Sequence, residues 1–288
     1  MGLKTVLITG CGPGGIGSAL AVEFHMRGHR VFATGLSESL LAHLRDRDIE
    51  TVILDVTSQS SIEQAASHVS KLTGGTLDIL INNAGILLAM PFADTDVEAA
   101  RKILDVNVLG VFAVTRAFLP LLLAASTAAK KNGSRGGDVL VVNIGSVNAN
   151  IRPPFFGIYN ASKAAVEVLG ATIRTELAPL GIRVVTVKTG SISSQLFNNA
   201  PPTKLPEDSL YRPAKVFIEG RKMLDMAPYT EPEVYAKKVV DELLRSSVKH
   251  VIWQGSLTTF AWILSWFGWE GMMDSIYIRL CKLNECTI

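Results

Sequence analysis

The chain has 288 residues, which is enough for one α/β domain with a sizeable core. Its formal net charge of +2 and the lack of a basic stripe argue against a nucleic-acid partner. The cysteines, Cys11, Cys281 and Cys286, show neither a disulfide framework nor metal-ligand spacing, so we expect no metal ion and a reducing, cytoplasmic compartment. The first apolar run is too short for a signal peptide and is typical of a strand.

Apolar runs with the length of buried strands alternate with helical periodicity along the chain. The expected strands are residues 5–9, 30–33, 51–54, 79–82, 139–144, 183–188 and 250–253. The expected helices are residues 17–27, 60–72, 97–123, 159–180 and 232–246. Continuously apolar strands between helices predict a parallel sheet covered on both faces, which is a doubly wound α/β fold.

No composition shift or internal repeat indicates a second folded domain. We therefore predict one domain over residues 1–255, followed by an apolar C-terminal extension over residues 256–288. Residues 128–138 are polar and rich in glycine, and they predict a loop without a catalytic role.

A glycine-rich turn follows the first expected strand and opens the first expected helix, at residues 12–17. In this position glycine lets backbone amides approach a pyrophosphate, and the helix N-terminus supplies partial positive charge. An ordinary glycine-rich loop is the simpler alternative. The flanking strand and helix favour a dinucleotide site.

A tyrosine and a lysine are spaced for joint chemistry. Tyr159 precedes Lys163 by four residues, which places both side chains on one face of a helix. An ammonium beside a phenol favours the phenolate, so we expect Lys163 to lower the pKa of Tyr159. An isolated pair is more often a core tyrosine and a surface lysine. Ser146, at the end of an apolar run, and the glycine-rich turn favour a catalytic site instead.

Together these residues resemble the short-chain dehydrogenase/reductase family from about residue 5 to about residue 253. The resemblance implies a single-domain Rossmann fold of about seven strands, with residues 191–231 as a lid over the substrate and a homo-oligomeric assembly. More narrowly, the chain is similar to fungal reductases that act on 1-acyl-dihydroxyacetone phosphate. Residues 32–34, 143–147 and 205–211 and the apolar C-terminus carry that narrower resemblance.

The resemblance implies a catalytic set of Asn107, Ser146, Tyr159 and Lys163. Tyr159 would donate a proton to a carbonyl oxygen that Ser146 also binds. Lys163 would in addition hold the nicotinamide ribose. Asn107 would hold a water that links Lys163 to solvent, although such a residue can also simply bend or cap a helix.

The resemblance also implies a set of cofactor contacts at the ends of the strands. They are Gly10, Gly12, Gly14, Ile16, Thr34, Ser37, Asp55, Asn83, Ala84, Gly85, Lys163, Thr189 and Ile192. Asp55 would accept from the adenine amine, or it could be a turn former. The family usually has three residues between Thr-Gly and Gly-Ile-Gly, whereas this chain has four, so we expect the loop to bulge.

The second expected strand ends without the acid that would bind a ribose 2′-hydroxyl and repel a 2′-phosphate. We therefore predict NADP(H), with Thr34 and Ser37 as hydrogen-bond donors to the phosphate. Ser37 could instead cap the next helix. NAD(H) stays open, because Leu36 occupies the place of the arginine found in related NADP-dependent reductases.

Aromatic and apolar residues such as Phe155, Phe156, Leu196 and Phe197 indicate a hydrophobic small-molecule substrate, although they could equally be core. Four cations are candidates for binding a substrate phosphate: Arg152, Lys204, Arg212 and Lys215. Tyr211 and Phe217 add apolar residues to the expected lid.

Residues 251–269 carry no charge and are rich in tryptophan, but polar residues interrupt the run. It is therefore a poor membrane-spanning segment. One alternative is peripheral contact with a membrane, on the cytosolic face of the endoplasmic reticulum or of lipid droplets. The other is packing on the substrate cleft or on a partner subunit.

Three functions are compatible with these features. The first is NADP(H)-dependent reduction of a lipid-like ketone such as an acyl-dihydroxyacetone phosphate. The second is the same chemistry on a polyketide or terpenoid in fungal secondary metabolism. The third is a redox-silent binding protein on the same scaffold, which the intact Ser146, Tyr159 and Lys163 argue against.

Overall fold

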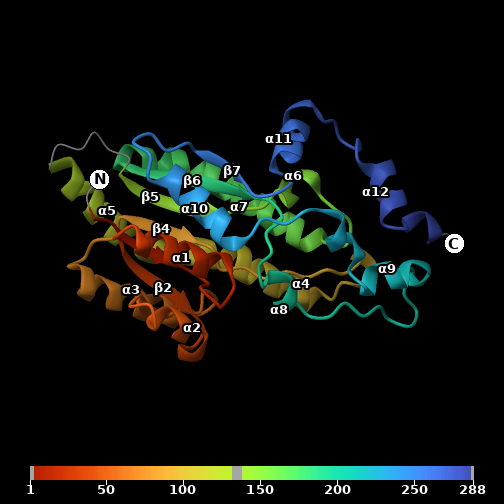
Figure 1. The fold of residues 1–288 in the computed structure, drawn as a ribbon, viewed down its shortest axis with the longest axis horizontal. Coiled ribbons are helices and arrows are strands. Elements are labelled where there is room, and N and C mark those ends of the chain that lie inside the picture. The colour runs from red at the N-terminus through yellow and green to blue at the C-terminus, as the bar shows by residue number, and fades with distance from the viewer. Residues whose placement is uncertain (1–2, 132–137, 287–288) are drawn as a thin grey trace.

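The computed structural model describes residues 3–131 and 138–286. Its centre is a seven-stranded sheet in which every pairing is parallel (Figure 1). The strands are β1 (Thr5–Ile8), β2 (Arg30–Gly35), β3 (Glu50–Ile53), β4 (Ile79–Asn82), β5 (Val139–Ile144), β6 (Ile182–Thr189) and β7 (Val251–Gln254). Their spatial order is β3-β2-β1-β4-β5-β6-β7. The order reverses between β1 and β4, which is where doubly wound sheets bind ligands.

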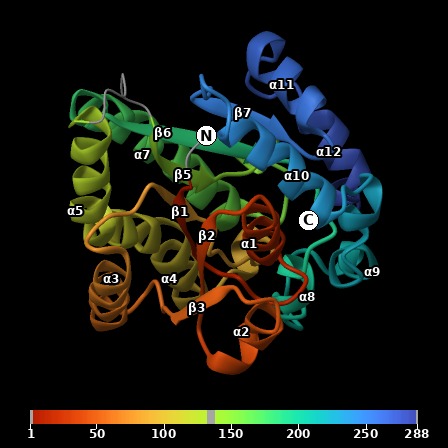
Figure 2. The same cartoon turned by 60° about the vertical axis from the view of Figure 1, so that its left-hand side comes forward.

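Helices cover both faces of the sheet, as Figures 1 and 2 show. One face carries α1 (Ile16–Met26), α2 (Glu38–Arg45) and α10 (Pro232–Leu243). The other carries α3 (Gln59–Thr73), α5 (Gly110–Lys131) and α7 (Gly157–Leu177, followed by η3, Ala178–Leu180). The doubly wound fold predicted from the strand and helix pattern is therefore confirmed.

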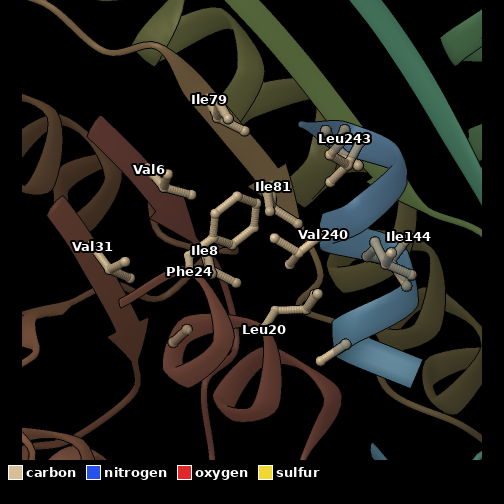
Figure 3. Close-up of a cluster of buried hydrophobic side chains, with 14 of the residues drawn as sticks. Val6, Ile8, Leu20, Phe24, Val31, Ile79, Ile81, Ile144, Val240 and Leu243 are labelled. Carbon is tan, nitrogen blue, oxygen red and sulfur yellow. The ribbon is translucent and has the colours of Figure 1, made fainter. Parts of the chain in front are cut away.

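Alternate residues of the strands supply two separate cores. Val6 and Ile8 of β1 lie in the core under α1 and α10, whereas Leu7 lies in the core under α3 and α5. This follows from the two-residue period of a strand. Figure 3 shows the first core, with Leu20, Phe24, Ile79, Ile81, Val240 and Leu243 around β1. Burial on both faces explains why the strands are continuously apolar.

The long helix expected at residues 97–123 is interrupted. It runs as α4 (Val97–Leu104), a π-helical turn η2 (Asp105–Leu109) and then α5. The last turn of α5 extends into the predicted loop at residues 128–138, and residues 132–137 of that loop lie outside the described part of the chain. Helix α2 was expected only through its cap residue.

The expected lid and the C-terminal tail consist of short helices. Two further short helices follow strands: η1 (Phe92–Asp94) comes after β4, and α6 (Asn148–Ile151) comes after β5. The lid contains α8 (Leu196–Asn199), η4 (Arg212–Ala214), α9 (Lys215–Glu219) and η5 (Lys222–Met226). The tail contains α11 (Thr258–Phe267), α12 (Asp274–Leu280) and η6 (Leu283–Glu285), and in Figure 1 it lies beside α6 and α9.

In the described part of the chain, one continuous helical stretch, Val97–Lys131, is long and apolar enough to cross a membrane. Core helices of soluble proteins pass the same test, and Phe118 and Leu122 of this stretch are fully buried against the sheet. The apolar helix of the tail, α11, has only 10 residues, which is shorter than a spanning helix requires.

Candidate active site

A cleft of about 1540 Å³ opens at the carboxyl ends of the strands. Its lining includes the residues that follow β1, β4 and β5, namely Gly10, Asn83 and Gly145. Gly35 at the end of β2 and Gly190 after β6 also line it. The cleft therefore lies at the switch point of the sheet, and it is larger than the ~300–1,000 Å³ of an ordinary ligand pocket.

The glycine-rich turn is packed so closely on the end of β4 that larger residues would not fit. Gly10 has a φ of +73°, and a Cβ atom there would lie 2.7 Å from the Cα of Ala84. A Cβ at Gly17 would lie 2.6 Å from both Asn83 Nδ2 and the Gly10 oxygen. Asn83 Nδ2 in turn donates hydrogen bonds to the carbonyl oxygens of Thr9 and Gly10, at 2.8 and 3.0 Å.

Local hydrogen bonds hold the glycine-rich turn, which is one residue longer than usual in the family. The Gly15 amide donates to the Gly12 oxygen at 3.1 Å, and the Cys11 amide donates to the Thr34 oxygen at 2.7 Å. The Ser18 hydroxyl lies 2.7 Å from the Gly12 oxygen and 2.9 Å from the Cys11 oxygen. Burial raises the pKa of the Cys11 thiol to about 12, so this cysteine is a core residue.

Most of the expected cofactor residues line the cleft. They are Gly10, Gly12, Gly14, Ile16, Asp55, Asn83, Ala84, Gly85, Lys163, Thr189 and Ile192. Asp55 also accepts hydrogen bonds from the amide and hydroxyl of Thr57, at 2.9 and 2.7 Å, so it forms a turn as well. The closely packed glycines, the helix N-terminus and the size of the cleft fit a dinucleotide.

Two expected contacts to the cofactor lie elsewhere. Thr34 shares a face of β2 with the buried Phe32, is fully buried, and its hydroxyl has no hydrogen-bond partner among the described residues. Ser37 caps α2 by accepting from the Leu40 amide at 3.4 Å. Neither residue is in the described lining of the cleft, where Leu36 lies instead. The prediction that Thr34 and Ser37 bind a phosphate is therefore not supported.

Three of the four expected catalytic residues meet in the cleft. Tyr159 and Lys163 lie one turn apart on α7, and Ser146 follows β5 in the same lining. Lys163 Nζ donates to the Ile144 carbonyl oxygen at 2.9 Å and lies 5.8 Å from the centre of the Tyr159 ring. Ser146, Tyr159 and Lys163 are all buried.

The expectation that Lys163 lowers the pKa of Tyr159 is wrong for this structure. Burial raises the pKa of the Tyr159 phenol to about 12, against a smaller lowering by the hydrogen bond to Ser146. Burial likewise lowers the pKa of Lys163 to about 8, against the charge of Glu167. Desolvation is the largest cause of both shifts because both groups are deeply buried. At neutral pH Tyr159 therefore carries its proton and is suited to donate it.

The fourth expected catalytic residue, Asn107, is buried in η2 and lies outside the described lining of the cleft. Its Oδ1 accepts from the Ile86 amide at 2.8 Å, and its Nδ2 donates to the Ile86 oxygen at 2.9 Å and to Ser162 Oγ at 3.0 Å. Asn107 therefore ties the segment after β4 to the catalytic helix, and its role in holding a water stays a prediction. The π-helical turn brings it to this position.

The substrate end of the cleft is apolar and is formed by three separate segments. Beside Tyr159 lie Leu87 and Phe156, and the lid adds Leu196, Phe197, Met223 and Leu224. The C-terminal tail adds Leu257, Phe260, Met273, Tyr277 and Cys281. The tail thus packs on the cleft, which is one of the arrangements expected for it.

Several residues expected near the substrate instead form a second apolar cluster, most of whose members belong to the lid. Phe155 packs edge-on against Tyr211, with ring centres 6.3 Å apart, and Cys281 and Phe217 join the same cluster. Met273 and Tyr277 were not predicted as site residues from the sequence. The uncharged run before them marks the tail as apolar, but no local pattern indicates which cleft it meets.

Comparison with known proteins identifies the family. A family model described as short chain dehydrogenase matches residues 4–205. A short-chain dehydrogenase/reductase of Pestalotiopsis microspora is 40% identical over 98% of this chain and 95% of its own. The short-chain dehydrogenase fogD of Aspergillus ruber is 36% identical over 99% and 96%. The chain therefore belongs to the short-chain dehydrogenase/reductase family.

Solved structures agree with this assignment. A short-chain dehydrogenase from Streptomyces avermitilis has a TM-score of 0.74 and 27% identity, covering 99% of this chain and 97% of that one. A short chain dehydrogenase from Burkholderia cenocepacia in complex with NADP has a TM-score of 0.69 and 25% identity, covering 96% and 97%. The protein is thus an NAD(P)(H)-dependent oxidoreductase that acts on CH–OH and C=O groups.

Proposed function

We propose that the protein reduces the ketone of an apolar small molecule with NADPH. The observation that carries this proposal is the wall of apolar side chains from the catalytic segment, the lid and the tail around Tyr159. Such a wall favours a hydrophobic substrate because burying apolar surface in it is worth about 25 cal/mol per Å².

Each catalytic residue of the cleft has a separate role in the proposed reduction. The nicotinamide cofactor, when bound, supplies the hydride that reaches the carbonyl carbon. Tyr159 donates its proton to the carbonyl oxygen, which completes the alcohol, and Ser146 orients that oxygen by a hydrogen bond. Lys163 presents a buried positive charge one helical turn away. The phenolate then regains a proton from solvent, and oxidation of an alcohol uses the same groups in reverse.

The preference for NADP(H) rests on the end of β2. Leu36 lies in the cleft there, and the next acid, Glu38, forms an ion pair with Arg45 at 2.5 Å. No carboxylate in this turn would repel a 2′-phosphate. We expect kcat/KM to be higher with NADPH than with NADH, and equal or better efficiency with NADH would contradict this preference.

The charges near the substrate favour an uncharged ketone, as in a polyketide or terpenoid pathway, over an acyl-dihydroxyacetone phosphate. In the described part of the chain, none of Arg152, Lys204, Arg212 and Lys215 lines the cleft. Arg152 is instead paired with Glu270 at 2.8 Å. The basic residues of the described lining are Lys163 and, on α4, Arg101 and Lys102.

A panel of ketones tests the substrate class. Uncharged apolar ketones of polyketide or terpenoid type are expected to give higher kcat/KM than an acyl-dihydroxyacetone phosphate of similar chain length. The reverse order would assign the protein to the phosphate-bearing substrate. Binding of NADPH without turnover of any ketone would favour the redox-silent alternative.

We also propose peripheral membrane contact through α11, on a cytosolic membrane face. Trp266, Phe267 and Trp269 are about 70% exposed (71%, 74% and 69%), and tryptophan favours the membrane interface. Co-sedimentation with phospholipid vesicles should fall when Trp266 and Phe267 are both replaced by serine. Equal sedimentation of the two proteins would contradict the contact.

We propose a homo-oligomer as well, because α5 and α7 expose apolar side chains. Phe112 is 50% and Val168 is 68% exposed, and Leu109 of η2 is 57% exposed. Sedimentation velocity is expected to give a mass above the 31.0 kDa of one chain. A monomer at micromolar concentration would contradict this proposal.

A further inference from the structure

A partly buried ion pair lies one helical turn beyond the catalytic lysine. Glu167 is one helical turn after Lys163 on α7, and its Oε2 lies 2.8 Å from Lys188 Nζ of β6. The side chains of Glu167 and Lys188 are only 18% and 13% exposed. Because residues four apart on a helix are neighbours, the carboxylate faces the same region as Lys163.

Lys188 is fixed by three groups. Besides Glu167, its ammonium donates to Asn150 Oδ1 at 2.9 Å and lies 4.8 Å from the centre of the Trp253 ring. Removing one partner of this partly buried pair leaves the other charge without its partner, which is unfavourable.

The second carboxylate oxygen of Glu167 has an unusual environment. Glu167 Oε1 is buried and accepts no hydrogen bond from any described residue. This oxygen lies close to Gly145, the residue between Ile144 and Ser146: a Cβ atom added to Gly145 would be 3.8 Å from Glu167 Oε1. A buried carboxylate oxygen without a donor is costly, so its retention calls for an explanation beyond the ion pair.

We propose that Glu167 is a positioning residue for Lys163, because its carboxylate, balanced by Lys188, keeps Lys163 in the ammonium form that donates to the Ile144 carbonyl. The proposal rests on the proposed reductase function, in which a positive charge beside Tyr159 is needed. It adds a residue to the site that touches neither substrate nor cofactor.

The electrostatics of the neighbouring groups agree with this geometry. Among the described residues, the titratable groups that face Lys163 are Tyr159 and Glu167 of α7, and Lys188 of β6 faces Glu167. The other neighbours are neutral: Asn107 of η2, Gly85 and the Ile144 carbonyl of β5.

The pKa directions give the sign of the effect. Burial lowers the pKa of Lys163, and the charge of Glu167 raises it. Burial also raises the pKa of Glu167, whereas Lys188 and Lys163 lower it. Losing the charge of Glu167 therefore lowers the pKa of Lys163 further. Losing Lys188 leaves the carboxylate less neutralised, and this raises the pKa of Lys163 as long as Glu167 stays ionised.

Two substitutions separate this role from a structural one. Glu167→Gln and Lys188→Met break the same ion pair, so a purely structural role predicts similar losses in both. Our proposal predicts opposite shifts in the pKa of Lys163, downward in Glu167→Gln and upward in Lys188→Met. We expect each shift to be about one unit, which is a tenfold change in proton affinity.

The direct readout is a pH titration of lysine labelled with carbon-13 at Cε, followed by NMR, with the Lys163 signal assigned from its loss in Lys163→Arg. The titration needs no cofactor, so it tests Glu167 even if the reductase proposal fails. Shifts in the same direction, or no shift in either variant, would overturn the proposal. Glu167→Asp, which keeps the charge, should retain most of the wild-type pKa and covers the case in which Glu167→Gln does not fold.

The functional readout is the pH at which ketone reduction by NADPH declines. It should move down in Glu167→Gln and up in Lys188→Met, in parallel with the NMR titration. If Lys163 titrates as predicted but wild-type protein reduces no ketone, the proposed function fails and the inference about Glu167 stands. If the pH at which ketone reduction declines shifts in the same direction in Glu167→Gln and Lys188→Met, the inference fails.

Discussion

The hydroxyl of Tyr277 donates a hydrogen bond to the carbonyl oxygen of Ile151, at 2.6 Å. Tyr277 lies in the C-terminal tail, and Ile151 lies between Ser146 and Tyr159. The neighbouring Arg152 forms an ion pair with Glu270 of the tail at 2.8 Å. The last helices of the chain are thus tied to the segment that carries the catalytic residues, and they form one wall of the substrate end.

Tyr277→Phe should weaken this wall without affecting the cofactor. The substitution leaves the Ile151 carbonyl without its donor, at a cost of about 1–3 kcal/mol if that oxygen stays buried. We expect KM for an apolar ketone to rise several-fold, whereas KM for NADPH stays unchanged. Trp266→Phe, on the exposed side of α11, is the control and should leave both values unchanged. Equal rises in both KM values for Tyr277→Phe would argue against a substrate wall.

Gly17→Ala should abolish most cofactor binding. The new Cβ would lie 2.6 Å from Asn83 Nδ2 and from the Gly10 oxygen, so the turn would have to move. We expect the Kd for NADPH, measured by fluorescence enhancement, to rise at least about tenfold, which corresponds to 1.4 kcal/mol. At Gly157 no described atom outside its own helical turn and chain neighbours lies within 4 Å of an added Cβ, and Gly157→Ala should bind NADPH normally. Unchanged binding by Gly17→Ala would show that the turn does not contact the cofactor.

Leu36→Asp should change the choice of cofactor. Leu36 is 64% exposed and lines the cleft at the end of β2, where an acid would bind a ribose 2′-hydroxyl and repel a 2′-phosphate. We expect kcat/KM for NADPH to fall about tenfold or more, while that for NADH is unchanged or rises. Equal losses with both cofactors would mean that the adenosine ribose lies elsewhere in the cleft.

The parts of the molecule that follow local patterns were predictable from the sequence. The strands are apolar on both faces, so their positions were clear, and helical spacing placed Tyr159 and Lys163 together. Thr34 was assigned to the cofactor from its place at a strand end, although the two-residue period of β2 places its side chain on the same buried face as Phe32. The position of Asn107 depends on a π-helical turn, which a helical pattern alone does not indicate.

Long-range contacts and burial account for the rest of the difference. Met273 and Tyr277 reach the cleft from the end of the chain, and no local spacing predicts such a contact. The pKa of Tyr159 was expected to fall because the sequence shows its neighbouring lysine. The structure adds the burial of both groups, which has the larger effect.

The pH dependence of ketone reduction should have a single decline above neutrality. With its pKa raised to about 12, Tyr159 keeps its proton through neutral and mildly alkaline pH, whereas Lys163 loses its charge as the pH rises through its pKa of about 8. Reduction needs the proton of Tyr159 and the positive charge of Lys163, so the rate at saturating NADPH should be constant near neutral pH and fall above pH 8. A rate that keeps rising beyond that pH would contradict a role for the Lys163 ammonium.

The most direct test of the account is NADPH oxidation by Tyr159→Phe in the presence of a ketone that the wild-type protein reduces, followed by near-ultraviolet absorbance. Loss of the proton donor should lower kcat by about 10²–10⁴-fold. The Kd for NADPH, measured by fluorescence on the same protein, should stay at the wild-type value. Near-normal turnover by Tyr159→Phe would contradict the assignment of Tyr159 as the proton donor.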